Sequence, residues 1–258
     1  MSGGAGPSTL GGTVAVDVPT ARELLEEVHK RIDREQITAI VHELELKSRL
    51  FAERLGPDAI RDADETVLRE VLGCVFVARR RASAVLGTRP ASELRDAINM
   101  LLYGDDAVGE RLEAFCGKVD LSGLCAAELA GELLHFTQPD RYWLCSRFVY
   151  NAQTRTGALP LLVSEDFDLE ADGTGAGYER AGIAIRSLDD SAETSSFRVD
   201  GGGTLATDLF LVCVYGVYMN TVLGLKMSQE FNSLIPPLPQ LARRLLGTHR
   251  MAPTTAGG

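Results

Sequence analysis

The chain has 258 residues, a net charge of -10 at pH 7 and an apolar fraction of 45%. This composition excludes a wholly disordered chain and is typical of a globular protein. The acidic balance argues against nucleic acid and anionic membranes as partners, because both attract basic surfaces.

Both ends of the chain have the composition of disordered tails. Residues 1–19 begin with MSGGAGPSTLGG, which has neither the basic start nor the apolar core of a signal peptide, and residues 248–258 are dominated by small residues. The five cysteines form no Cys-x-x-Cys pair and lie mostly in apolar surroundings. We therefore expect a cytoplasmic protein with reduced thiols.

Helical periodicity dominates residues 20–150. Thr20 opens a T-A-R-E capping box, and apolar side chains recur at helical spacing over residues 35–55 until Gly56-Pro57 interrupts the pattern. The same periodicity predicts further helices over residues 65–86, 91–102, 108–116, 126–136 and 143–150. These segments together predict a helical bundle.

The character of the sequence changes after Gly157. Gly-rich and acidic turns separate three short apolar runs, which predict strands over residues 159–163, 181–188 and 195–199. Seventeen residues without a charge, 209–225, reach only the lower limit for a membrane span, so they predict a buried helix over 206–226.

We therefore expect a mainly helical α+β fold that forms a single domain over residues 20–247. Its expected parts are the helical bundle over 20–150, a small antiparallel sheet or hairpin within 159–200, and the buried helix near the C-terminus.

The stretch from Glu132 to Val163 concentrates aromatic side chains, including the single tryptophan of the chain. Aromatic and arginine side chains dominate protein interfaces, and four of them lie close together here: Arg141, Tyr142, Trp143 and Arg147. We expect these four residues to bind a protein partner, with Trp143 partly exposed. The predicted function is a protein-interaction or accessory role without a catalytic centre of its own and without a cofactor. The composition leaves open assembly into a homo-oligomer.

An alternative function comes from two Glu-x-x-His motifs, Glu26 with His29 and Glu132 with His135. Side chains three residues apart share one helical face, and ferritin-like carboxylate proteins present such pairs to two iron or manganese ions. Under this alternative the protein is a helical-bundle metalloprotein with a carboxylate-bridged di-iron or di-manganese site. The pattern departs from that family because no helix with a lone glutamate precedes Glu26.

Residues 135–147, HFTQPDRYWLCSR, interleave aromatics and arginines that could stack on bases and hold phosphates. This stretch resembles a Pro-x-Arg-Tyr segment of helical proteins similar to helix-hairpin-helix glycosylases, which implies nucleic-acid binding. The resemblance covers only these residues and brings no catalytic Lys and Asp at recognisable positions. Neither a G-x-S-x-G elbow nor a phosphate-loop motif occurs, so the sequence leaves open whether the chain is an enzyme.

Overall fold

A computed structural model of the protein describes residues 16–87, 90–119, 121, 123–191, 197, 203–226 and 236–251. The described part is mainly α-helical, with 68% of residues in helices. The α-helices are α1 (Val18–His29), α2 (Arg34–Leu55), α3 (Glu65–Gly73), α4 (Ala82–Gly87), α5 (Ala91–Tyr103), α6 (Val108–Lys118), α7 (Gly123–Thr137), α8 (Thr174–Asp189), α9 (Gly203–Lys226) and α11 (Leu238–Leu246). Short 3-10 turns lie at Ala59–Asp62, Leu159–Leu161 and Thr248–Arg250.

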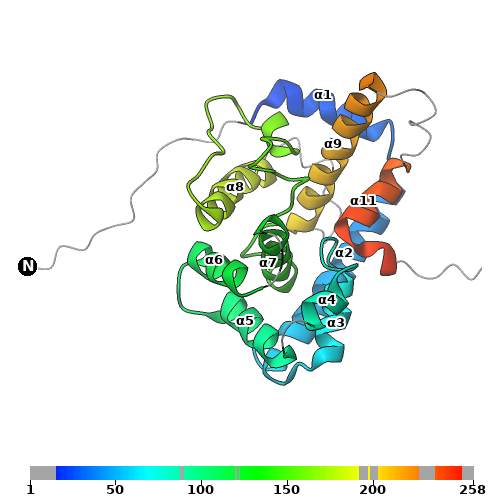
Figure 1. The fold of residues 1–258 in the computed structure, drawn as a ribbon. Helices are drawn as coiled ribbons and strands as arrows, with labels where there is room; N and C mark the ends of the chain where they lie inside the picture. The colour runs from blue at the N-terminus through cyan, green and yellow to red at the C-terminus, as the bar shows by residue number, and fades with distance from the viewer. Residues whose placement is uncertain are drawn as a thin grey trace, which may run out of the picture.

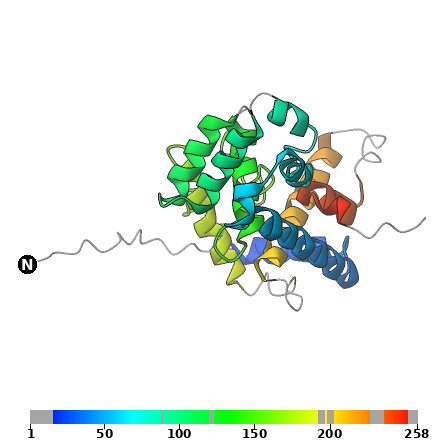
Figure 2. The ribbon, with the colours of Figure 1, turned by 90° about the horizontal axis from the view of Figure 1, so that it is seen from below.

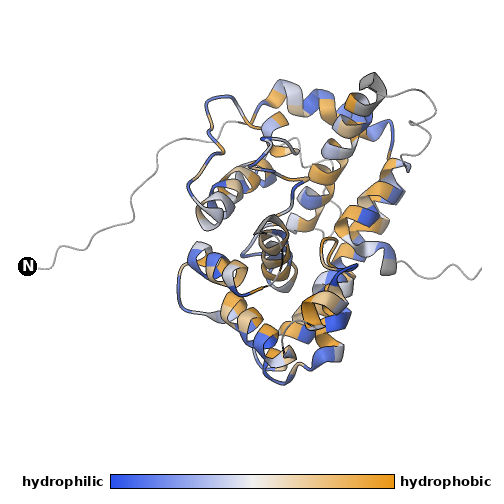
Figure 3. Ribbon diagram, viewed as in Figure 1, coloured by the Kyte–Doolittle hydropathy of each residue, from blue (hydrophilic) through white to orange (hydrophobic). Residues whose placement is uncertain are grey.

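Helix α7 is the centre of the fold and is seen end-on in Figure 1. It packs against α2, α5 and α6, while α8 lies on the other side of α6 and α9 packs against α1, α2 and α11. The buried apolar residues of these helices form one core cluster. Figure 3 colours hydrophobic positions orange along the ribbon of these helices. The view from below in Figure 2 shows the long α2 running along one side of the molecule.

Side-chain caps fix where the first helices begin. Asp17 accepts a hydrogen bond from the Thr20 backbone N–H, so α1 begins two residues before the position that the capping box predicts. Asp33 and Gln36 form a reciprocal capping box at the start of α2. Asp64 caps α3 through the Val67 N–H. Each cap satisfies a backbone donor that the helix itself leaves unpaired.

The prediction of a small antiparallel sheet over residues 159–200 is wrong, because the described residues contain only two isolated β-bridges and no strand. Residues 159–161 form a 3-10 turn, and residues 181–188 belong to α8. Ala181, Ala184, Ile185 and Leu188 are buried at helical spacing, so a short apolar run was misread as a strand. The third predicted strand, 195–199, lies outside the described residues except for Phe197, which is buried.

Helix α9 contains the uncharged segment and is largely buried between its neighbours. By length and composition it is the one described helix that could cross a membrane. Its burial against α1, α2, α8 and α11 makes it a core helix of this fold. The prediction of a buried helix at 206–226 is therefore confirmed over residues 206–217, whereas residues 218–222 are partly or fully exposed.

Two further predictions need correction. The helix expected over residues 65–86 is interrupted between Gly73 and Ala82, and residues 143–150 form turns and irregular backbone in place of a helix. At the C-terminus the expected tail begins in a 3-10 turn with Thr248 buried. Residues 1–15 and 252–258, the greater part of both expected tails, lie outside the described residues.

Candidate functional site

The second Glu-x-x-His pair lies in the core on α7, where each member already has a partner. The Lys47 Nζ donates to a Glu132 oxygen at 2.8 Å and to the Leu246 carbonyl oxygen at 2.7 Å. The same ammonium lies 3.7 Å from the centroid of the Phe136 ring. Burial raises the pKa of Glu132, although the charge of Lys47 opposes this effect. Glu132 is therefore engaged in a buried ion pair.

His135 is held between two acceptors. Its Nδ1 lies 2.9 Å from the Tyr142 carbonyl oxygen, and its Nε2 lies 2.6 Å from a carboxylate oxygen of Asp208. Both partners accept hydrogen bonds, so both ring nitrogens carry protons and the imidazole is positively charged. Burial lowers the pKa of His135, but the Asp208 carboxylate and the two hydrogen bonds outweigh it and raise the pKa. A histidine in this state has no lone pair for a metal.

The first Glu-x-x-His pair lies on α1, where Glu26 and His29 are both exposed. The His29 ring packs on Phe197 at a centroid distance of 5.4 Å. Over the described residues, no three His, Cys, Asp or Glu side chains come together in a group that could hold a metal ion. The structure therefore does not assemble Glu26, His29, Glu132 and His135 into an iron or manganese site.

The aromatic segment faces inward. Trp143 and Tyr142 are each only 7% exposed, so the expectation of a partly exposed Trp143 is wrong. The Trp143 ring stacks on Tyr178 with centroids 4.7 Å apart, and its Nε1 donates to the Tyr178 carbonyl oxygen at 2.7 Å. The Tyr142 hydroxyl accepts from Arg111 at 2.8 Å. These rings pack against α6 and α8 and do not form an interface of their own.

The two arginines of the predicted interface differ in their exposure and in their partners. Arg147 forms a two-pronged ion pair with Glu128, at 2.8 and 2.9 Å, and this hydrogen-bonded carboxylate raises the pKa of Arg147. Arg141 is exposed, lies 5.4 Å from the Tyr142 ring centroid and donates to the Gln138 side chain. Of the four predicted interface residues, only Arg141 is fully on the surface.

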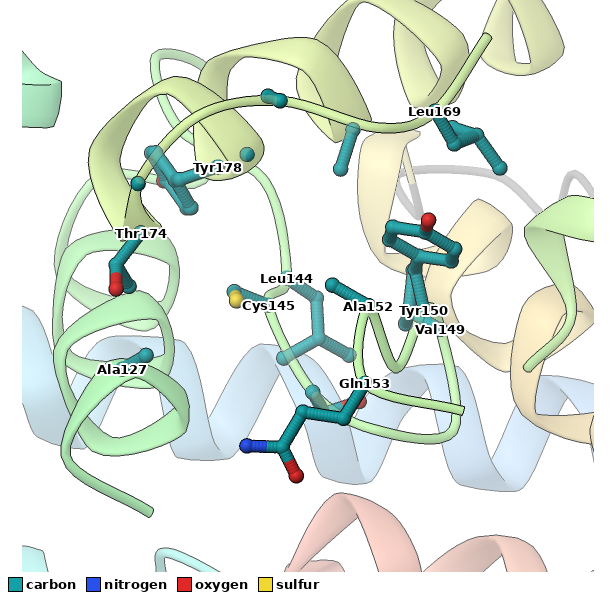
Figure 4. A pocket seen from close by; sticks show the side chains of 15 residues that line it. Ala127, Leu144, Cys145, Val149, Tyr150, Ala152, Gln153, Leu169, Thr174 and Tyr178 are labelled. Atoms are coloured by element: carbon teal, nitrogen blue, oxygen red, sulfur yellow. The ribbon is translucent and has the colours of Figure 1, made fainter. Parts of the chain in front are cut away.

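Directly beside this segment lies a cavity of about 380 Å³, between α7, α8 and residues 144–153. This volume is at the lower end of the range of roughly 300–1,000 Å³ that is typical of small-molecule sites. Its lining residues are mostly apolar or small: Ala127, Leu144, Cys145, Ser146, Val149, Tyr150, Ala152, Gln153, Leu169, Ala171, Gly173, Thr174, Gly177, Tyr178 and Ala181. Figure 4 shows Tyr178, Thr174 and Ala127 on one side, Tyr150 and Leu169 on the other, and Leu144 and Cys145 between them.

Two glycines allow the elements around this cavity to pack closely against residues 143–145. A Cβ on Gly131 of α7 would lie 2.2 Å from the Cys145 Cβ, and a Cβ on Gly182 of α8 would lie 2.0 Å from the Trp143 ring. Only glycine permits such an approach. At Gly177, by contrast, an added Cβ meets no atom within 4 Å, because that position faces open space.

The two deeply buried hydroxyls of the lining residues are not available to a ligand. The Tyr178 hydroxyl donates to the Trp143 carbonyl oxygen at 3.3 Å. The Ser146 side chain is 4% exposed, and its Oγ makes no hydrogen bond with any described residue but has almost no accessible surface of its own. The lining therefore presents mainly apolar surface to the cavity.

The remaining chemistry of the lining is neutral. None of the fifteen lining residues is charged. Burial raises the pKa of the Cys145 thiol to about 12, so this sulfur is protonated at neutral pH and is a poor nucleophile. The cavity has the features of a binding site and lacks an activated group of its own.

Comparison of the chain with protein-family models, with curated proteins and with solved structures finds no match. The functional argument therefore depends on the geometry of the chain itself.

The sequence pointed to one wall of the cavity and missed the other. Seven lining residues, from Leu144 to Gln153, lie within the stretch from Glu132 to Val163 that the aromatic content singled out. The opposite wall comes from α8, including Gly177 and Tyr178, which the sequence reading assigned to a turn ahead of a strand. The Gly-x-Gly-Tyr spacing from Gly175 to Tyr178 carries no motif that would have indicated a cavity.

Proposed function

We propose that this protein binds a small, mostly apolar molecule in the cavity between α7, α8 and residues 144–153. The role is that of a binding or accessory protein, because the lining is mostly apolar and offers no charged or activated side chain. Apolar cavities with few polar groups are the usual form of small-molecule sites.

The observation that carries this proposal is the cavity itself, whose lining residues are uncharged and mostly apolar or small. Apolar surface that stays in contact with water is unfavourable. A ligand that covers the lining removes this surface from water and gains affinity in proportion to the area buried.

Binding can be tested with prodan, a neutral naphthyl ketone whose absorption overlaps tryptophan emission. The only tryptophan, Trp143, stacks on the lining residue Tyr178, so bound prodan should quench Trp143 by energy transfer in a saturable manner. Gly177→Leu should fill the cavity, since its side chain would project into open space. We expect at least about tenfold weaker binding by this variant, equivalent to about 1.4 kcal/mol.

Gly117→Leu is the matched control. Gly117 is a helical glycine on α6 that also has no atom within 4 Å of an added Cβ, but it is exposed and does not line the cavity. The control should bind prodan as the wild type does. Equal binding by all three proteins, or no saturable binding by the wild type, would refute the proposal.

A second candidate function is protein interaction through Arg141 and Arg186. Both side chains are exposed, and neither forms an ion pair with another described residue. Arg186 lies 4.8 Å from the Trp143 ring centroid, and both arginines line a surface hollow of about 370 Å³. The one acidic residue of its lining, Glu179, accepts a hydrogen bond from the Gly109 N–H. Arginines held on aromatic rings are typical of interface centres.

The partner that suits this hollow is an acidic peptide. Fluorescence anisotropy with a labelled Asp-rich and Glu-rich peptide should show binding that Arg141→Ala/Arg186→Ala abolishes. Arg95→Ala, at a half-buried position on α5 outside the hollow, is the control. No binding by the wild type, or unchanged binding by the double variant, would exclude this candidate.

A further inference from the structure

We infer that the ion pair of Arg155 and Glu170 sets the length of the ligand that the cavity accepts. The pair holds closed a partition between the cavity and an adjoining hollow. This inference rests on the proposed function and names two specificity-determining residues for it. It follows from the residues that both spaces share, from the way in which each side of the partition is anchored, and from the backbone of Arg155.

The adjoining hollow has a volume of about 300 Å³ and shares two lining residues with the cavity, Tyr150 and Leu169. Figure 4 shows these two side chains on the same side of the cavity. They form the partition, and a ligand can extend from the cavity into the hollow only where it parts. Beyond it, Pro160, Val163 and Phe167 offer apolar surface to an extended ligand. The charged lining residues of the hollow are all exposed to solvent: Arg155, Glu165, Asp168 and Glu170.

The ion pair lies beside this partition. Arg155 belongs to the turn that follows Tyr150, and its guanidinium contacts the carboxylate of Glu170. Glu170 directly follows Leu169 in the chain. Burial raises the pKa of Tyr150, the Glu170 carboxylate raises it further, and the Arg155 guanidinium opposes this effect. Both charges therefore lie near the Tyr150 hydroxyl, and the pair joins the two segments that supply the partition.

The Leu169 side of the partition is fixed to α8. The Asp168 carbonyl oxygen accepts a hydrogen bond from the Nε of Arg180, a residue of α8, at 2.6 Å. The same guanidinium lies 5.0 Å from the Phe167 ring centroid. The Asp168 carboxylate in turn accepts from the Glu170 N–H at 2.8 Å. Glu170 is therefore presented by a fixed segment.

The Tyr150 side depends on the short turn 151–156. Two backbone hydrogen bonds, of 2.7 and 3.3 Å, close this turn at its base, so it keeps its own shape. Arg155 adopts a φ of 52°, in the left-handed region that favours glycine. Because a glycine would relieve this strain, the advantage of arginine here lies in its side chain, which reaches Glu170. The ion pair thus ties the turn to the fixed side.

The ion pair can open while the rest of the protein stays folded. The side chains of Arg155 and Glu170 are 73% and 52% exposed, and exposed ion pairs contribute little to stability because water and salt screen them. Opening frees the turn, separates Tyr150 from Leu169 and joins the cavity to the adjoining hollow.

Prodan and its hexanoyl homologue, which differ only in the length of the acyl chain, test the inference. Quenching of Trp143 measures both affinities. In the wild type the longer chain finds no room, so the homologue should bind no more tightly than prodan. Arg155→Gln and Glu170→Gln each break the ion pair. Each should shift the preference toward the homologue by at least about tenfold, because the added chain then buries apolar surface in the hollow.

Two controls separate the ion pair from the loss of a charge. Asp172→Asn neutralises a neighbouring exposed carboxylate that lines neither space, and it should keep the wild-type preference. Arg155→Glu/Glu170→Arg restores the pair in reverse and should return the preference to the wild-type value. An unchanged preference in either single variant, a swap that behaves as the single variants do, an equal shift in Asp172→Asn, or a wild type that already prefers the homologue tenfold would overturn the inference.

Gly177→Leu distinguishes failure of the inference from failure of the proposed function. If this variant still weakens prodan binding, the cavity is the binding site even where the ion pair does not set the ligand length. If prodan binding does not depend on Gly177, the proposed function itself fails.

Discussion

Trp143 and Tyr178 form a stacked pair that joins the core to the wall of the cavity. Their ring centroids are 4.7 Å apart, the Trp143 Nε1 donates to the Tyr178 carbonyl oxygen, and the Tyr178 hydroxyl donates back to the Trp143 carbonyl oxygen. Residues 35 positions apart are thereby connected by one stack and two hydrogen bonds. This pair holds α8 against the segment that carries Ser146.

Replacing Trp143 should weaken the whole fold. Trp143→Ala removes a buried ring, its stacking interaction with Tyr178 and a hydrogen bond. We expect this change to lower the free energy of unfolding by about 3–5 kcal/mol. Trp143→Phe keeps part of the stack and should cost less. Urea unfolding followed by far-UV circular dichroism measures both. A loss below about 1 kcal/mol for Trp143→Ala would contradict the buried position of this ring.

The same substitution at two glycines of α8 should change the stability of the protein in opposite directions. Gly182→Ala places a methyl group 2.0 Å from the Trp143 ring, so we expect destabilisation by about 1–3 kcal/mol. Gly177→Ala meets no neighbour and should stabilise α8 by about 0.5–1 kcal/mol, since alanine is the better helix former. Thermal unfolding of the two variants gives the signs. Stabilisation by Gly182→Ala would show that α8 lies farther from Trp143.

The ion pair of Lys47 and Glu132 should be strongly coupled in a double-mutant cycle. Glu132→Leu leaves the fully buried Lys47 without its carboxylate, which should cost about 3–5 kcal/mol. Adding Lys47→Met to this variant removes the unpaired charge and should recover much of that loss. Urea unfolding of the four proteins gives the coupling energy. Additive losses would show that the two residues are not paired.

His135 should make stability depend on pH. Its pKa in the folded protein is raised above the ordinary value of 6.5, so its pairing with Asp208 contributes fully below that value and is lost as the pH rises through the raised pKa. The cost of His135→Gln should therefore be largest at low pH and shrink on going from about pH 5 to pH 9. Unfolding of both proteins across this range measures the difference. A cost that grows with pH would contradict a charged His135.

The helices that the sequence predicted well are those with a long run of apolar residues at helical spacing. The helix over residues 35–55 and the one over 126–136 are observed as α2 and α7, with small shifts at their ends. The prediction for residues 181–188 was wrong because a short apolar run does not by itself distinguish a strand from a helix. In the folded protein these residues belong to α8, which packs closely on Trp143.

The candidate site was harder to predict because its parts are distant in sequence. Sequence reasoning selected Glu132 and His135 as metal ligands, yet their partners Lys47 and Asp208 lie 85 and 73 positions away. Nothing local to either pair indicates those contacts. The α8 wall of the cavity was likewise invisible, since Gly177 and Tyr178 come together with residues 144–153 only in the folded chain.

The most direct test of the central claim is a crystal structure of the protein with prodan bound. We predict ligand density in the cavity, between Tyr150 and Tyr178. Ligand density only at another place on the molecule, or none at a prodan concentration that saturates the quenching of Trp143, would contradict the claim.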